Sequence, residues 1–278
     1  VESCPEKTIP QLKGPIFDLV MSELFDDADR NRFFTPRAVT AFVAAWACPQ
    51  PGERIVDPCY GSGGFLLAMA QWIERSLAQS GTVVEDHSTL FDTSFRYVMN
   101  LGQGGGAENR AMVDKMLHGM DREPAAAWSG KTNVALHGFG GSHLHQTDAL
   151  DLANISFDLE SFDVVAGNPP FGDKITDPAI LKQFELGRDS KDQPLNQQAS
   201  EVLFIETFLR LAVTGGRVVI LVPDGILANL REQRVRDYLV RHTVIEAVIG
   251  LPRRVFRNDA KSNILLLRKK RATDESQE

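Results

Sequence analysis

The sequence contains few cysteines and no long apolar run. Its three cysteines, Cys4, Cys48 and Cys59, have spacings that fit neither a disulfide framework nor a metal cluster. We therefore expect a reducing, cytoplasmic environment and no bound metal. Apolar stretches such as Val218–Val222 are far too short to cross a bilayer, so no membrane partner is expected. The amino terminus has no signal-peptide pattern, and the start at Val1 instead of Met favours a piece of a longer chain.

Basic residues are fewer than acidic ones, with 30 Lys or Arg against 37 Asp or Glu. The formal net charge of −7 argues against bulk binding of nucleic acid. Between Leu203 and Arg271, however, 14 Lys or Arg stand against 6 Asp or Glu. This excess predicts one basic surface, with Arg253, Arg254 and Arg257 as candidate phosphate contacts; scattered solvated charges are the alternative. The sequence has no pattern of a zinc module or of a basic helix-turn-helix that would read bases.

The sequence does contain a regular alternation of apolar runs and helical stretches, which is typical of a parallel sheet covered on both faces. Strands are expected at 53–57, 115–121, 143–148, 162–168, 217–223, 243–251 and 262–270. Helices are expected at 65–79, 123–138 with a break near Gly130, 200–216 with a glycine stop, and 231–241. This order predicts an α/β fold with a doubly wound, mostly parallel seven-stranded sheet.

The predicted limits are 1–50 for an N-terminal helical segment packed on the core, 51–271 for the main domain and 272–278 for a polar tail. A helix in the first segment follows from Thr35, which suits a helix cap, and Pro36, which suits the first helical position. Residues 80–106 are rich in Gly, Ser and Asp and predict an inserted excursion. Residues 173–199 are polar without periodicity and predict a long loop.

A glycine-rich turn follows the first predicted strand, at the edge where ligands bind in such sheets. The strand ends in Asp57 and Pro58, and the turn contains Gly61, Ser62, Gly63 and Gly64. Glycines let the backbone approach a ligand closely, and the following helix offers free N–H groups. The turn fits neither the phosphate loop nor the usual dinucleotide fingerprint, and a tight connection is the alternative. The carboxylate of Asp57 disfavours a pyrophosphate and favours a cationic, amine-bearing ligand.

Further acids follow the next two predicted strands. Asp121 ends the second strand, where an acid can accept both ribose hydroxyls, and Glu123 competes for that role. Asp148 follows the third strand and is a candidate acceptor for an adenine amine. Each acid alone fits a helix-capping role equally well. Together with Asp57 and the glycine turn, these acids predict a nucleoside ligand with a positive centre.

The stretch Asn168-Pro169-Pro170-Phe171 comes directly after the fourth predicted strand. Paired prolines remove two backbone donors and fix two φ angles. They also push the residue before each proline out of the helical conformation. The result is a stiff, extended exit from the strand whose carbonyls are available to a ligand. A structural proline turn is the alternative.

These motifs resemble those of DNA adenine-N6 methyltransferases, most closely the modification subunit of type I restriction-modification systems. The resemblance covers about residues 30 to 270 and rests on "FFTPRAVTAFVA", "IVDPCYGSGGFL", "HGMD", "DVVAGNPPFGD", "GGRVVILVPDGIL" and "SNILLLRKK". It implies the sheet of S-adenosylmethionine-dependent methyltransferases and that cofactor. Two departures stand out: Cys59 and Tyr60 fill the places of a small residue and a cysteine, and Asp121 stands where Glu is frequent.

The resemblance also implies residue roles. The expected cofactor-binding residues are Phe34, Thr35, Pro36, Asp57, Pro58, Gly61, Ser62, Gly63, Gly64, Asp121 (ribose) and Asp148 (adenine). The expected catalytic residues are Asn168, Pro169, Pro170 and Phe171. The Asn168 side-chain oxygen and the Pro169 carbonyl would accept the two hydrogens of the adenine amine, which frees the nitrogen lone pair. Phe171 would stack on the base after it leaves the duplex.

The activity implied is site-specific methylation of adenine in DNA as part of a restriction-modification system. The implied partners are double-stranded DNA with a flipped adenine and a separate specificity subunit, with a restriction (nuclease) subunit as a further candidate. Because fold does not decide substrate, two alternatives stay open. One is a methyltransferase that acts on a protein glutamine amide or an RNA base amine. The other is a catalytically silent DNA-binding subunit with the same fold.

Overall fold

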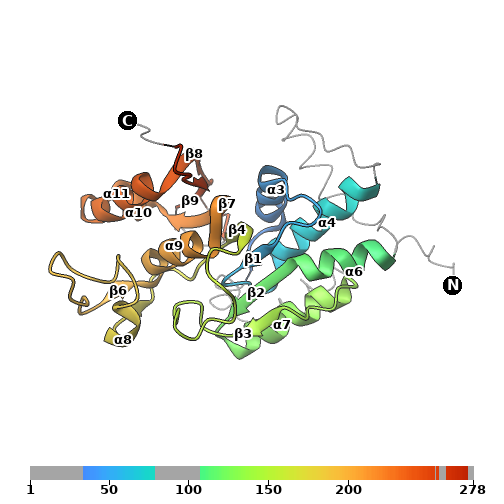
Figure 1. Cartoon of the computed structure of the whole chain (residues 1–278), viewed down its shortest axis with the longest axis horizontal. Helices are drawn as coiled ribbons and strands as arrows, with labels where there is room; N and C mark the ends of the chain where they lie inside the picture. Colours follow the sequence, from blue (N-terminus) through green and yellow to red (C-terminus); the bar gives the residue numbers. More distant parts are fainter. Residues whose placement is uncertain (1–33, 79–106, 254, 257–260, 275–278) are drawn as a thin grey trace. The chain divides into compact units, whose positions relative to one another are not determined.

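The structure, a computed structural model, describes residues 34–78, 107–253, 255–256 and 261–274 (Figure 1). The chain divides into two compact units. Among the described residues, unit 1 comprises 34–53, 60–78, 107–118 and 123–144, and unit 2 comprises 54–59, 119–122 and those from 145 onward. The predicted excursion at 80–106 lies outside the described residues, as do residues 1–33 and the last four. The predicted domain limits stay a prediction.

Unit 2 contains the main sheet, apart from the first residues of two strands. Its strands are β1 (Ile55–Asp57), β2 (Leu117–Asp121), β3 (Leu144–Gln146), β4 (Phe162–Gly167), β7 (Ala212–Pro223), β8 (Thr243–Gly250) and β9 (Ser262–Lys269). Their spatial order is β3-β2-β1-β4-β7-β9-β8. Strand β4 runs parallel to β1 and β7, whereas β9 runs antiparallel to β7 and β8. The predicted α/β fold with a mostly parallel seven-stranded sheet is confirmed.

Unit 1 contains α3 (Arg37–Ala47), α4 (Gly64–Ala78), α6 (Ala107–Met116) and α7 (Pro124–Leu136). Helix α3 packs along α4, and α4 contacts α6. The sequence does not predict α6, because "AENRAMVDKM" is half polar and lacks an apolar repeat. Helix α7 is continuous, so the predicted break near Gly130 is wrong. The predicted Thr35 cap is also wrong by one position: Pro36 is the N-cap residue of α3 and makes no side-chain capping bond.

Unit 2 also contains α8 (Pro178–Leu181), α9 (Ser200–Leu211), α10 (Asp224–Ala228), the 3-10 helix η3 (Leu230–Glu232) and α11 (Gln233–His242). The predicted glycine stop of α9 is wrong. The helix ends at Leu211, and Gly215 and Gly216 lie inside β7. Strand β7 already pairs with β4 at Ala212, opposite Phe162, and the register of the two strands shifts before Arg217, where Gly215 has a φ of 82°.

The predicted loop at 173–199 contains short regular elements. Strand β5 (Lys174–Ile175) pairs antiparallel with β6 (Gln198–Ala199). Helix α8 begins after Asp177, whose side chain accepts a hydrogen bond from the Ala179 backbone N–H. Both ends of this segment are therefore held together close to the start of α9. None of the helices in the described part of the chain is long and apolar enough to cross a membrane.

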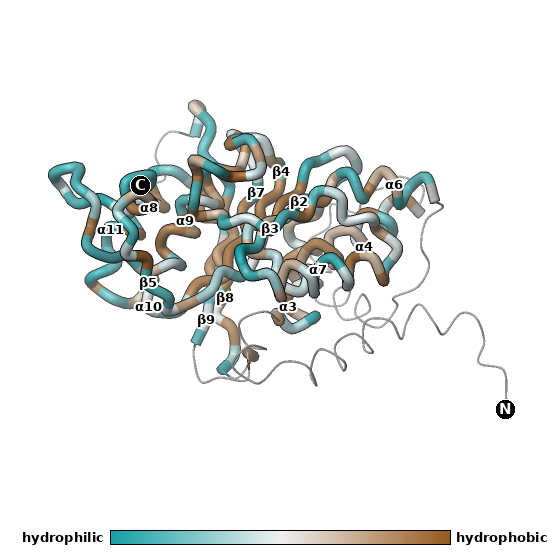
Figure 2. The backbone as a smooth tube through the Cα atoms, turned by 90° about the horizontal axis from the view of Figure 1, so that it is seen from below, coloured by the Kyte–Doolittle hydropathy of each residue, from teal (hydrophilic) through white to brown (hydrophobic). Residues whose placement is uncertain are grey.

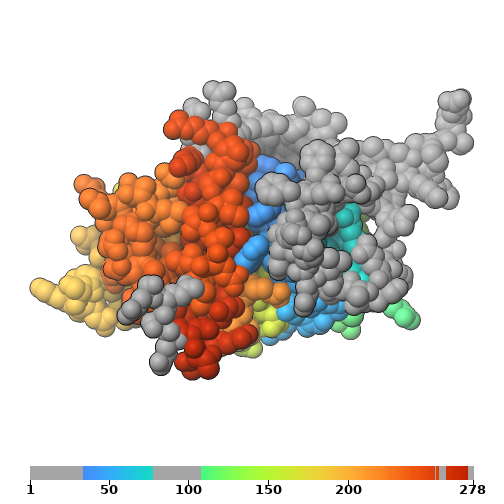
Figure 3. All heavy atoms as spheres, turned by 90° about the horizontal axis from the view of Figure 1, so that it is seen from above, coloured from blue at the N-terminus to red at the C-terminus, as the bar shows by residue number. Residues whose placement is uncertain are grey.

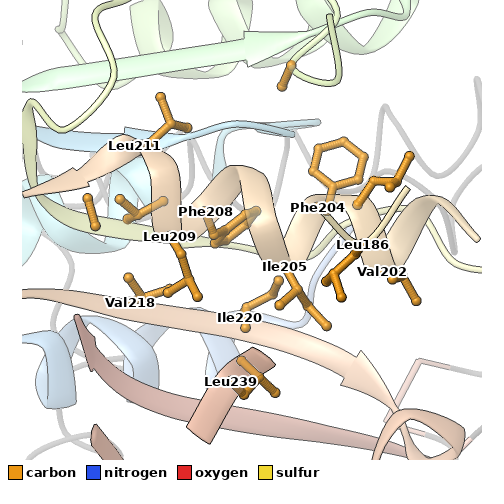
Figure 4. Packing of buried hydrophobic residues seen from close by; sticks show 14 of the residues in the cluster. Leu186, Val202, Phe204, Ile205, Phe208, Leu209, Leu211, Val218, Ile220 and Leu239 are labelled. Atoms are coloured by element: carbon orange, nitrogen blue, oxygen red, sulfur yellow. The ribbon is translucent and has the colours of Figure 1, made fainter. Parts of the chain in front are cut away.

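The core of unit 2 lies between α9 and the middle of the sheet. Figure 4 shows Ile205, Phe208 and Leu209 of α9 over Val218 and Ile220 of β7. All five side chains are at most 2% exposed. The strands in the centre of the sheet are largely brown, the hydrophobic colour, in Figure 2. Burying side chains of this size stabilises the fold by about 1.5–3 kcal/mol each, so α9 is firmly fixed against β7.

Candidate active site

Four neighbouring strands of the sheet end in or just before polar side chains. Asp148 follows β3, Asp121 ends β2, Asp57 ends β1 and Asn168 follows β4. These strands are adjacent in the order β3-β2-β1-β4, and the strand order reverses between β1 and β4. Ligands of doubly wound sheets bind at such a reversal, outside the carboxyl ends of the strands. The predicted acids and the Asn168 turn therefore share one edge of unit 2.

Asp57 is the most unusual ionisable group of this edge. Its side chain is 1% exposed, and Oδ1 accepts a hydrogen bond of 3.0 Å from the Cys59 backbone N–H. Within the described residues, the buried Oδ2 has no hydrogen-bond partner. Burial raises the pKa of Asp57 to about 8, and the nearby charge of Asp121 adds to the rise. A cation or a hydrogen-bond donor that reaches Oδ2 would supply the missing contact.

Gly167 allows Asp57 to lie against the end of β4. A Cβ atom at Gly167 would overlap Oδ1 of Asp57 and lie 3.2 Å from the Cys59 sulfur. The Cys59 thiol itself is half-buried, and burial beside Asp57 raises its pKa well above the ordinary value. Glycine is therefore required at the last position of β4 by this close approach. Sequence reasoning missed Gly167, although its place directly before Asn168 was a usable signal.

The turn after β4 is anchored by the start of α9. Pro169 is buried, and the Ser200 hydroxyl donates a hydrogen bond of 3.0 Å to the Pro170 carbonyl. The Gly172 backbone N–H donates one of 3.1 Å to the Glu201 carboxylate. Ser200 and Glu201 are 0% and 8% exposed. Neither was predicted as a site residue, because a serine and a glutamate at the start of a helix are typical of ordinary capping.

An ion pair joins the residues that follow two of these strands. Arg122, directly after β2, lies 3.2 Å from the Asp173 carboxylate. Strand β1 separates β2 from β4 in the sheet. The pair therefore links the segments that follow β2 and β4. Both side chains are about one-third exposed, at 37% and 31%, so the pair contributes little to stability.

The other predicted acids differ in their surroundings. The Asp148 carboxylate accepts a hydrogen bond of 2.9 Å from the Leu150 backbone N–H, which is an ordinary turn contact. Asp121 is half-buried, and its backbone carbonyl accepts a bond from the Thr147 N–H. Glu123, the competing candidate, is exposed and is the N-cap residue of α7, without a side-chain capping bond. The ribose and adenine roles of Asp121 and Asp148 stay predictions.

The glycine turn, Gly61 to Gly64, belongs to unit 1 and packs against α7. Gly61 and Gly63 have φ of 50° and 78°, which favours glycine. The Asn133 side chain donates a hydrogen bond of 2.8 Å to the Ser62 carbonyl. Tyr60 is 2% exposed, and its hydroxyl donates to the Ala127 carbonyl at 3.1 Å. The bulky Tyr60 ring is therefore part of the interior of unit 1.

Replacing Gly130 with alanine is expected to destabilise the protein, although alanine normally favours a helix interior by about 1 kcal/mol over glycine. A Cβ atom at Gly130 would lie 2.5 Å from the Gly61 carbonyl oxygen and 2.5 Å from the Tyr60 ring. The clash forces the glycine turn away from α7 and costs about 1–3 kcal/mol. Thermal unfolding of Gly130→Ala measures the loss. The control is Lys131→Ala, on the exposed face of α7. Gly52 is unsuitable as a control although an added Cβ would meet nothing within 4 Å, because its φ of 92° strains any other residue.

The predicted residues Phe34, Thr35 and Pro36 are half-buried and directly precede α3 in unit 1. Thr40 of α3 faces the glycine turn: a Cβ at Gly64 would lie 3.5 Å from its methyl group. These contacts fix the position of α3 and the turn within unit 1. A cofactor role for Phe34–Pro36 and Gly61–Gly64 stays a prediction.

The C-terminal part of the chain is coloured orange to red in Figure 3. Many of its basic side chains bond to other residues of the protein. Arg236 donates to the carbonyls of Ile226 and Asn229, and Arg234 to those of Glu185 and Arg188. Lys269 contacts Glu160 at 2.7 Å. The predicted basic surface is therefore weaker as a phosphate site than the charge count indicates. Of its three candidate phosphate contacts, Arg254 and Arg257 lie outside the described residues, and Arg253 is exposed.

No group of three or more His, Cys, Asp or Glu in the described residues is arranged to hold a metal ion. The polar groups that the described residues bring to this edge are its carboxylates and the carbonyls of its proline turn. A buried carboxyl group, an asparagine followed by two prolines and a half-buried aromatic ring are suited to hold a planar amine next to a cationic centre.

Comparisons with known proteins agree with the predicted family and fold. Residues 10–278 match the N-6 DNA Methylase family. The EcoEI methylase subunit of a type I restriction enzyme from Escherichia coli is 27% identical over 270 residues, which are 95% of this chain and 48% of that protein. The EcoKI methylase subunit from Escherichia coli is 24% identical over 86% of this chain and 40% of its own length. The chain spans about half the length of these curated relatives.

Solved structures show the same fold. The modification subunit of a type I restriction enzyme from Vibrio vulnificus superposes with a TM-score of 0.70 and 22% identity, over 97% of this chain and 51% of that one. A structure described as showing complex assembly and conformational transition of the type I system gives a TM-score of 0.68 and 25% identity, over 95% and 47%. Since the family match extends over nearly the whole chain, this protein belongs to the N-6 DNA methylase family.

Proposed function

We propose that this chain carries the adenine-methylating centre of a restriction-modification enzyme and transfers a methyl group from S-adenosylmethionine to the exocyclic amine of adenine in duplex DNA. The observation that carries the proposal is the position of Asn168–Phe171, at the end of β4 and beside Asp57, where the strand order reverses. Membership of the N-6 DNA methylase family supports the same reaction.

The surroundings of Asp57 fit S-adenosylmethionine. Its Oδ2 is buried without a hydrogen-bond partner in the described residues, and the pKa of the carboxyl is raised to about 8. A ligand that brings a positive charge and N–H donors would offset the cost of ionising this group. S-adenosylmethionine has both an ammonium and a sulfonium, and its bound sulfonium supplies an electrophilic methyl group. Asp57 and Pro58 would border the cationic end of the cofactor.

The turn after β4 would prepare the amine of adenine. That amine is a poor nucleophile because its lone pair is delocalised into the ring. When the Asn168 side-chain oxygen and the Pro169 carbonyl accept its two hydrogens, the nitrogen moves toward tetrahedral geometry and the lone pair is freed. The prolines keep these acceptors in place before the substrate arrives, so little reorganisation is needed during the reaction. Phe171 would stack on the flipped base, a contact worth about 1–3 kcal/mol.

Sequence-specific methylation would need a second polypeptide or further parts of the protein. The net charge is −7, and Arg234, Arg236 and Lys269 hold carbonyl or carboxylate groups of unit 2. Affinity for DNA depends on lysines and arginines that neutralise phosphates. We therefore include a separate specificity subunit in the proposal, with a nuclease subunit as a further candidate partner and cytoplasmic DNA as the substrate.

The test is the sequencing of modified adenines in DNA from cells that contain the full-length protein, from cells lacking its gene, and from cells with Asn168→Ala. We expect N6-methyladenine at one short sequence in the first cells and its loss in the other two. N6-methyladenine that persists at that sequence in cells lacking the gene would contradict the proposal. In that case, a label transferred from S-adenosylmethionine to protein or RNA in the same extracts would identify another sp² amine as the acceptor.

A further inference from the structure

The side chains of the first two residues of α9, Ser200 and Glu201, bond to the turn after β4. Serine at a helix start normally accepts a backbone N–H of the first turn and caps the helix. Here the N-cap residue is Ala199, and α9 has no side-chain capping bond. Forgoing such a cap costs about 1 kcal/mol. The Ser200 hydroxyl instead donates to the Pro170 carbonyl at 3.0 Å.

Three hydrogen bonds join this helix start to the turn that follows β4. Besides the Ser200 hydroxyl, the Ser200 backbone N–H donates to the Asp173 carbonyl at 2.9 Å. The Gly172 N–H donates to Glu201 Oε2 at 3.1 Å. The pairing of β5 with β6 begins directly beyond, with Lys174 opposite Ala199. The turn is therefore tied at three points to a helix that is itself packed on the sheet (Figure 4).

These contacts fix the backbone where prolines leave it with few partners. Pro169 and Pro170 have no N–H, so their turn cannot be held by their own backbone donors. Because Pro169 precedes a proline, its backbone is extended. In an extended chain, successive carbonyls point to different sides. Holding the Pro170 carbonyl on Ser200 therefore sets the direction of the Pro169 carbonyl, which the proposed reaction uses as an acceptor.

We infer that Ser200 and Glu201 are positioning residues that clamp the Asn168–Gly172 turn in its reactive conformation. The inference rests on the proposed function of that turn. Glu201 holds its far end at Gly172, and Ser200 holds its middle at Pro170. Neither residue has to touch the cofactor or the base. Both are buried, so their contacts persist without competition from bulk water.

The experiment uses the full-length protein with the subunits that copurify with it. It compares Glu201→Ala, Glu201→Gln and Ser200→Ala with wild type. The matched control is Thr207→Val, which also removes a buried hydroxyl from α9. The Thr207 hydroxyl bonds to the carbonyls of Leu203 and Ala149 and not to the turn. Two quantities are measured: hydrogen exchange of the peptide that contains Gly172, and the single-turnover rate of methyl transfer from labelled S-adenosylmethionine to methyl-free genomic DNA at saturating concentrations.

In Glu201→Ala, we expect faster exchange of the Gly172 amide and a transfer rate lower by on the order of 10- to 100-fold, as follows from a misplacement of about 1 Å. Affinity for S-adenosylmethionine should stay unchanged. Glu201→Gln keeps an acceptor oxygen and should recover most of both properties, and Ser200→Ala should lower the rate with a smaller effect on Gly172. Thr207→Val should transfer at the wild-type rate.

The outcomes separate the clamp from the proposed function. If wild type methylates DNA and folded Glu201→Ala does so equally fast, or if its Gly172 amide exchanges as in wild type, the clamp is overturned. If wild type transfers no methyl group but Glu201→Ala loses protection at Gly172 and Glu201→Gln restores it, the clamp stands and the methyltransferase proposal fails. Should Glu201→Ala not fold, Ser200→Ala decides by the ratio of its rate to that of Thr207→Val.

Discussion

Replacing Asn168 with alanine is expected to lower the rate of methyl transfer by about 10²- to 10³-fold, the usual effect of removing one preorganised hydrogen-bonding group from a reacting centre. The side chain of Asn168 follows the last residue of β4, at the edge that also holds Asp57. In the proposed reaction it accepts a hydrogen from the adenine amine, so its loss leaves the nitrogen lone pair in the ring. The single-turnover rate at saturating cofactor and DNA measures the effect.

The affinity for S-adenosylmethionine should hardly change in Asn168→Ala, because the side chain acts on the amine and not on the cofactor. Asn168→Asp is the matched variant. Its carboxylate can still accept a hydrogen, so it should be clearly more active than Asn168→Ala. Calorimetric titration of cofactor into all three proteins serves as the control for folding and binding. Normal turnover by Asn168→Ala would end the proposed role of the turn.

Parts of the fold were predictable because the pattern is repeated along the chain. Strands β7 and β9 contain the continuous apolar runs Val218–Val222 and Ile264–Leu267, which are typical of strands covered on both faces. The residues that end β1, β2 and β4 could then be placed at one edge, since parallel strands bring their carboxyl ends together. Asp57 and Asp121 end such strands and Asn168 follows one, as predicted.

The contacts that hold the site could not be predicted from one sequence. Ser200 has the pattern of a helix cap, and only its distance of 3.0 Å to the Pro170 carbonyl shows another use. Gly167 reads as the last residue of a strand, yet a Cβ there would overlap the Asp57 carboxylate. Gly130 predicted a helix break because glycine has low helix propensity, but packing against Tyr60 and Gly61 overrides propensity. Each of these features depends on residues distant in the sequence.

Replacing Asp57 with asparagine is expected to have two opposite effects: loss of cofactor binding and a gain in stability at neutral pH. The pKa of Asp57 is raised from 3.8 to about 8 because the side chain is buried. The folded protein therefore binds a proton here that the unfolded chain has already lost. Between pH 4 and pH 8 the free energy of unfolding falls by up to about 1.4 kcal/mol per pH unit from this group alone.

The free energy of unfolding is therefore not reduced by Asp57 below the unfolded pKa of 3.8, and it declines as pH rises toward the folded pKa of about 8. Asparagine keeps an oxygen for the Cys59 N–H and never ionises, so Asp57→Asn should be free of this decline. Thermal unfolding of both proteins from pH 5 to pH 9 gives the comparison. The midpoint difference in favour of Asp57→Asn should widen as pH rises to about 8 and then level off. A constant difference would mean that the Asp57 carboxyl is not held protonated in the folded protein.

Cofactor binding should depend on pH with the same group. Below pH 8, binding of a cation at Asp57 must first release the proton that burial holds there. For wild type, the affinity for S-adenosylmethionine should therefore rise about tenfold per pH unit between pH 6 and pH 7, and titrations in buffers of different ionisation heat should report about one proton released.

Asp57→Asn should bind at least 10- to 100-fold more weakly, in line with the loss of about 1.5–3 kcal/mol for a hydrogen bond to a charged group. Asp163→Asn is the control, because its carboxylate lies near the start of β4, on the Arg54 N–H at 2.8 Å, far from the strand ends. Equal binding by wild type and Asp57→Asn would place the cofactor elsewhere. The expected result is that Asp163→Asn binds as wild type does, while the loss in Asp57→Asn relative to wild type depends on pH. That result ties the positive centre of the ligand to the end of β1.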